Sequence, residues 1–76
     1  MPKLPALATA ELQPHYLISP DQQQLLRFHR AGDHQAAVAV FTLDGNRWRM
    51  QQAGFCWLGL ARQRWQDRRL QGWQRV

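Results

Sequence analysis

The chain has 76 residues, which limits it to one domain, and it carries ten Lys and Arg against five Asp and Glu, a net charge of +5. Its single cysteine, Cys56, excludes an internal disulfide, and one cysteine with three histidines does not make a zinc ligand set. The longest apolar run, residues 55–61, is far shorter than the roughly 20 residues that span a bilayer. We therefore expect a reduced, cytoplasmic protein without a metal ion or another cofactor.

Residues 1–14 are expected to form an extended N-terminal arm, flexible or docked, before one globular domain over residues 15–76. Prolines in the arm remove backbone donors and disfavour helical backbone in the residues before them. A helix over residues 6–13 would be marginal by itself in water. The arm is therefore expected to be ordered only if it docks through its leucines, which are Leu4, Leu7 and Leu12.

The next segment carries the signals of a helix start. Ser19 is a favourable N-cap, Pro20 suits the first helical position, and the charge of Asp21 suits the helix dipole. Gly32 would end the helix, as glycine often does just beyond the last turn. This pattern predicts a helix over residues 20–31.

Residues 37–51 are predicted to form a β-hairpin, because Asp-Gly suits a tight turn between strands. If Asp44 and Gly45 occupy the centre of the turn, Phe41 faces Trp48. If the loop has three residues, Thr42 faces Trp48 instead, so the register stays open. The competing interpretation is a helix over residues 34–43, favoured by its alanines.

The last long element is predicted to be a helix over residues 54–71 that ends at Gly72. Leu58, Ala61 and Trp65 share one face of this helix, and with Trp57 they are expected to belong to the core. A short buried strand over residues 55–60 is the alternative. Two shorter segments, residues 15–18 and 73–76, are candidate strands.

The sequence therefore predicts a small single domain of the α+β class, in the order helix, β-hairpin, helix, with an extended N-terminal arm. The alternative is a winged helix-turn-helix-like fold. In that fold Gly32 would occupy the turn, and the Asp-Gly hairpin would be the wing. Against it, the bulky Phe28 stands where the motif usually has a small residue.

Charge and tryptophan are concentrated in residues 47–76. This stretch holds seven arginines against Asp67, a net charge of +6, and all four tryptophans, whereas the first 46 residues carry −1. Arginine suits phosphates and indole rings suit the faces of bases. The candidate nucleic-acid-binding residues are Arg47, Arg49, Arg62, Arg64, Arg68, Arg69, Trp48 and Trp73.

The first hypothesis is a non-enzymatic nucleic-acid-binding or nucleic-acid-associated regulatory protein that uses this Arg/Trp-rich half. The alternative is a small protein-interaction module, such as an inhibitor, an adaptor or a self-associating subunit. No catalytic pattern supports an enzyme. Cys56 has apolar neighbours in the sequence, and no general base for it can be identified. The five acidic residues do not have a spacing suited to catalysis by a pair of carboxylates. We expect neither a membrane nor a small-molecule substrate as partner.

Overall fold

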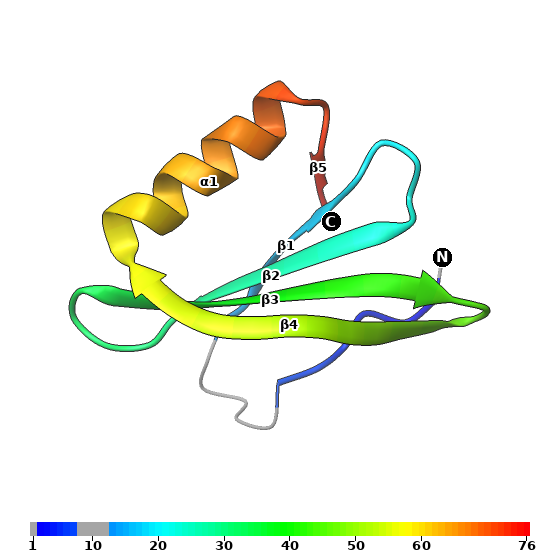
Figure 1. The fold of residues 1–76 in the computed structure, drawn as a ribbon, viewed down its shortest axis with the longest axis horizontal. Coiled ribbons are helices and arrows are strands. Elements are labelled where there is room, and N and C mark those ends of the chain that lie inside the picture. Colours follow the sequence, from blue (N-terminus) through cyan, green and yellow to red (C-terminus); the bar gives the residue numbers. More distant parts are fainter. Residues whose placement is uncertain (1, 8–12) are drawn as a thin grey trace.

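The computed structural model describes residues 2–7 and 13–76, and in this part of the chain it contains five β-strands and one α-helix (Figure 1). The strands form one antiparallel sheet in the order β4-β3-β2-β1-β5. Their bounds, with those of the helix, are β1 His15–Ile18, β2 Gln24–Arg30, β3 Gln35–Asp44, β4 Arg47–Trp57, α1 Leu58–Leu70 and β5 Gln74–Arg75. No helix in these residues is long and apolar enough to cross a membrane.

The predicted order helix, hairpin, helix is wrong, and so is the winged helix-turn-helix alternative, because residues 24–30 are a strand. The supposed helix start is the turn between β1 and β2. The Ser19 hydroxyl donates to the Asp21 carboxylate at 2.6 Å and accepts from the Gln24 amide at 2.9 Å. The Gln23 amide also donates to Asp21 at 3.1 Å. Ser and Asp satisfy backbone groups in turns as readily as at helix starts, so the capping pattern did not distinguish the two.

Strand β2 lies between β1 and β3 and is buried on both faces of the sheet. Leu25 is fully buried on one face and Leu26 is 6% exposed on the other. Adjacent leucines thus enter two separate cores, because successive side chains of a strand point to opposite faces. This pattern has no alternation of apolar and polar residues, which explains why the strand was missed.

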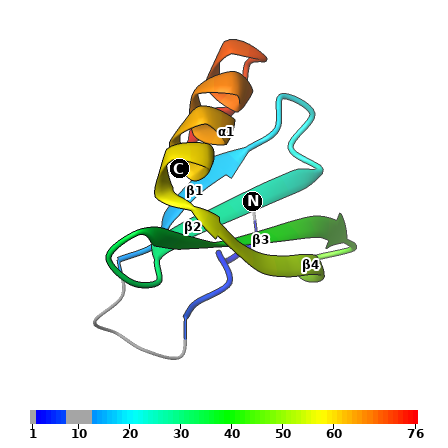
Figure 2. The same cartoon turned by 60° about the vertical axis from the view of Figure 1, so that its left-hand side comes forward.

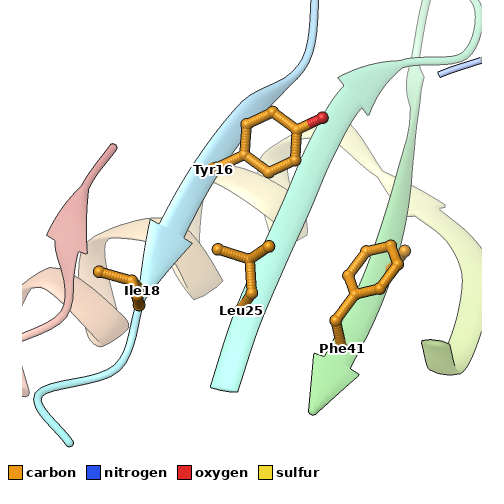
Figure 3. Close-up of a cluster of buried hydrophobic side chains, with 5 residues drawn as sticks. Tyr16, Ile18, Leu25 and Phe41 are labelled. Atoms are coloured by element: carbon orange, nitrogen blue, oxygen red, sulfur yellow. The ribbon is translucent and has the colours of Figure 1, made fainter. Parts of the chain in front are cut away.

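The two faces have different covers. On the first, the arm face, the N-terminal arm packs: Leu4 contacts the core there, and the Tyr16 hydroxyl donates to the Pro5 carbonyl. The buried residues of this arm-face cluster are Tyr16, Ile18, Leu25, Ala39 and Phe41 (Figure 3). The short helix considered over residues 6–13 overlaps residues 8–12, which include Leu12 and lie outside the described part of the chain.

On the second face, the helix face, α1 packs (Figure 2). The buried residues of this helix-face cluster are Leu17, Leu26, Phe28, Ala36 and Ala61. The predicted core residues Leu58 and Trp65 pack against it, but Trp57 does not and is 66% exposed. The helix begins at Leu58 instead of residue 54, because residues up to Trp57 continue the ladder with β3.

The hairpin is present in a register that neither predicted alternative described. Asp44 pairs with Arg47 and Leu43 with Trp48, so Gly45 and Asn46 form the turn. Gly45 has a φ of 62°, as the first central residue of a type II′ turn requires. One extra residue, Gln51, bulges opposite the Val40/Phe41 step of β3. The competing helix over residues 34–43 is wrong.

The end of α1 follows the prediction. Gly72 has a φ of 94°, the Gly72 amide donates to the Arg69 carbonyl at 3.1 Å, and the Trp73 amide donates to the Arg68 carbonyl at 3.0 Å. These two bonds form a Schellman motif, for which glycine is the favoured residue. The chain then returns to the sheet as β5, beside Leu17 and Ile18. The candidate strands at residues 15–18 and 73–76 are thereby confirmed.

Replacing Leu25 with Ala should lower the free energy of unfolding by about 2–5 kcal/mol, the cost typical of a buried leucine. Leu70→Ala is the matched control, because Leu70 is 87% exposed and its loss should cost less than about 0.5 kcal/mol. Urea unfolding followed by circular dichroism measures both values. Equal effects of the two substitutions would contradict the central position of β2.

The turn after β1 should weaken in acid. The Ser19 hydroxyl and then the Gln23 amide hold the pKa of Asp21 below its usual value of 3.8. The stabilisation by the charged carboxylate is therefore complete above pH 3.8 and is lost as the pH falls through the lower folded-state pKa. An NMR titration of the Asp21 carboxyl carbon should show this lowered pKa, and Ser19→Ala should raise it. A wild-type pKa at or above 3.8 would be the contrary result.

Candidate nucleic-acid interface

Helix α1 divides the arginines of the helix face into two groups. Ala61 faces the sheet and is 6% exposed, and Trp65 packs edge-on against Phe28 with ring centroids 5.4 Å apart. Arg62 and Arg64 therefore leave the helix on opposite flanks of this buried stripe. Of the candidate arginines on this helix, Arg62 and Arg69 lie on one flank and Arg64 and Arg68 on the other, so the four do not form one surface.

The flank of Arg62 borders an open cavity of about 700 Å³ between α1 and the start of β1. Phe28, Leu58 and Trp65 form apolar parts of its wall. Three arginines from different elements reach the same cavity: Arg30 from the end of β2, Arg62 from α1 and Arg75 from β5. We call this space the α1 cavity.

The arginines of the α1 cavity have few competing partners. Arg75 lies 3.1 Å from the ring nitrogen Nδ1 of His15, and Arg30 donates to the carbonyls of Gly32 and Asp33 at 3.0 and 2.9 Å. Among the described residues, no Asp or Glu contributes to the cavity wall. The cavity wall therefore carries three positive charges and no carboxylate, although Asp33 lies with Arg30 and Arg62 around a smaller adjoining pocket. The excess of positive charge favours an anion.

The opposite flank of α1 borders a second groove, of about 510 Å³, above the valines of β3. Arg64 and Arg68 line it together with Asp67, whose carboxylate accepts a bond from Gln63 at 3.0 Å. Arg68 lies over the Trp73 ring, 5.5 Å from its centroid, and donates to Gln71 at 3.2 Å. Trp73 thus supports Arg68 and packs against the helix-face cluster.

The two arginines of the hairpin, Arg47 and Arg49, are on the helix face, because they pair with Asp44 and Thr42, but they do not line this second groove. Arg49 already forms an ion pair with Asp44 at 2.7 Å. Both side chains of that pair are more than half exposed, so the pair is weak and solvent-screened.

Trp48 lies on the arm face, away from every arginine of the predicted set. It pairs with Leu43 and packs half-buried against the arm-face cluster. Its indole N–H is buried and has no hydrogen-bond partner among the described residues. The aromatic side chains that are most exposed are instead Phe55, at 73%, and Trp57, at 66%.

Sequence reasoning missed Arg30 and Arg75 as partners of Arg62. Arg30 lies in the acidic first half of the chain, and only the pairing of β2 with β1 and β3 brings it below α1. Arg75 lies in the Arg/Trp-rich half of the chain, but its neighbour His15 is 60 residues away in sequence.

In the described part of the chain, no three His, Cys, Asp and Glu side chains come together as a metal site would require. Cys56 is a half-buried free thiol that packs against the helix-face cluster. Comparison with protein-family models, with characterised proteins and with solved structures found no match to this chain. The functional argument therefore rests on the geometry of the two flanks of α1.

Proposed function

We propose that the protein is a non-enzymatic nucleic-acid-binding protein that holds a single strand along the α1 cavity. The observation that carries the proposal is the convergence of Arg30, Arg62 and Arg75 around an open cavity with an aromatic wall. Arginine binds phosphate through a planar pair of donors, which suits a backbone that passes between several such groups.

The apolar wall favours an unpaired strand over a duplex. Half-buried Trp65 presents aromatic carbon to the cavity, Leu58 adds aliphatic surface, and Phe28, which is 7% exposed, lies at the base of the wall. Base faces are available to such a surface only when they are not stacked inside a double helix, and contact of a base with an aromatic side chain contributes about 1–3 kcal/mol. In this arrangement Trp48 and Trp73 have no stacking role, because neither side chain lines the α1 cavity.

The electrostatic part of the proposal sets the salt dependence. Three arginines that neutralise phosphates of a single strand give a slope of about −2 for the logarithm of affinity against the logarithm of salt concentration. Phosphate contacts carry no sequence information, so binding is expected to discriminate little between base sequences. Arg69, seven residues after Arg62, lies on the same flank of α1 but does not line the cavity.

The double variant Arg62→Gln/Arg75→Gln tests the proposal, because both side chains are exposed and border the α1 cavity. Fluorescence anisotropy with labelled single-stranded DNA and RNA should show at least about a tenfold loss of affinity and a salt slope reduced by about 1.4. Thermal unfolding followed by circular dichroism verifies that the variants fold.

The matched control is Arg47→Gln/Arg64→Gln, which removes the same charge from exposed positions outside the α1 cavity, Arg64 on the other flank of α1 and Arg47 on the hairpin. It should lower affinity only through the weaker overall field, by less than the first pair. Equal losses in the two double variants would refute the assignment to the α1 cavity. Absence of binding by the unmodified protein at low salt would refute nucleic-acid binding altogether.

A further inference from the structure

Strand β4 is an unprotected sheet edge. It is 11 residues long, about twice the usual length of a strand, and within residues 2–7 and 13–76 it pairs with β3 only (Figure 1). Such an edge presents a row of unpaired backbone N–H and C=O groups to any other strand.

The direction of these groups follows from one hydrogen bond at the end of the strand. The Leu58 amide donates to the His34 carbonyl at 2.8 Å, so the amide of residue 58 points toward β3. Amide directions alternate along an antiparallel ladder. The amides of Gly54 and Cys56 therefore point toward β3, and those of three residues point outward. The outward amides belong to Ala53, Phe55 and Trp57.

The side chains in the second half of β4 do not protect this edge. Monomeric proteins usually place charged residues or proline on an exposed edge, but residues 50–61 contain neither. Instead Phe55 and Trp57 expose most of their surface, and Met50 is 48% exposed. Protection is limited to the hairpin end of β4, where Arg47 and Arg49 are charged and Gln51 bulges; the ladder is regular beyond it, from Gln52 to Trp57.

We propose that β4 pairs antiparallel with β4 of a second copy of this chain, about a two-fold axis near Gly54. The positions of the arginines favour antiparallel over parallel pairing, although each copy carries a net charge of +5. For any axis from residue 53 to residue 55, Arg49 of one copy lies level with residues 57–61 of the other, which are uncharged. Antiparallel pairing thus places the arginines of the two hairpins at opposite ends, whereas parallel pairing would bring them together.

Assembly through this edge also closes at two copies. The opposite edge of the sheet is β5, which has only two residues and offers little for a further strand. A two-fold axis uses the same surface of both copies, so no β4 edge remains free.

The area available predicts a dimer that dissociates on dilution. Because an aromatic side chain has roughly 150–250 Å² of surface, the exposed parts of Phe55 and Trp57 amount to on the order of 250 Å² per copy. Specific interfaces begin near about 600 Å² per partner. Met50, which is 48% exposed, and the backbone of β4 add to this area, so the interface lies at or below the lower end of the range.

Pairing about an axis perpendicular to the sheet puts both helices on the same side of one continuous sheet. The α1 cavity lies on the flank of the helix away from β4, so the pairing leaves it open. If the proposed function holds, a dimer would offer two such cavities to one nucleic-acid strand and bind it more tightly than a monomer. The pairing itself does not depend on nucleic acid and is measured without it.

Sedimentation velocity of the protein alone, from low micromolar to near-millimolar concentration, tests the pairing. We expect the unmodified protein to change from monomer to dimer over this range. Phe55→Lys places a charge at the unprotected edge and should raise the dimer dissociation constant at least tenfold. Leu70→Lys adds the same charge at the 87% exposed end of α1 and should dimerise like the unmodified protein. A monomer at near-millimolar concentration, or unchanged association of Phe55→Lys, would overturn the proposal.

Hydrogen exchange observed by NMR supplies a second measurement. The outward amides of Ala53, Phe55 and Trp57 should exchange more slowly as protein concentration rises, whereas those of Gly54 and Cys56 are protected at every concentration. Protection of the outward amides that does not change with concentration would place their partner within the same chain and reject the dimer. Added salt should strengthen self-association, because it screens the repulsion between two positively charged copies. It should weaken nucleic-acid binding. Each of the two proposals can therefore be refuted without refuting the other.

Discussion

The burial of β2 on both faces is the constraint on which the rest of this structure depends. Leu25 and Leu26 are neighbours in sequence but belong to two different cores, so the small domain has to cover two faces of one sheet. The arm, through Leu4, covers part of one face, and a helix of 13 residues covers part of the other. These two covers are too small for a sheet that includes two strands of 10 and 11 residues.

The surfaces proposed as functional are the parts that remain uncovered. Beside α1 the incomplete cover leaves the α1 cavity, where side chains of β2, α1 and β5 meet. At the other end of the sheet the incomplete cover leaves β4 exposed. Most residues of this strand are exposed, and they include the apolar Met50, Phe55 and Trp57. The two surfaces lie on different flanks of the helix, which is why the sequence pattern of interleaved Arg and Trp does not correspond to a single patch.

The sequence was informative where a local rule has one structural outcome. Asp44 and Gly45 indicated the hairpin, and Gly72 indicated the end of α1, because few other residues tolerate positive φ. Ser19 and Asp21 were misleading, since their side chains satisfy backbone amides in a turn as well as at a helix start. The exposure of Trp57 could not be predicted, because it depends on the residue at which β4 ends and α1 begins. The α1 cavity could not be predicted either, because only strand pairing brings Arg30 and Arg75 together.

The most direct test of the central claim is a two-dimensional NMR titration of the labelled protein with a single-stranded oligonucleotide at low salt. The α1 cavity as binding site predicts that the largest shifts occur at residues 28–30, at residues 58–66 and at Arg75. The hairpin arginines and the arm face should shift little, and the changes should disappear as salt is added. Shifts centred on β4 and Arg64, or no shift at any salt concentration, would contradict the account.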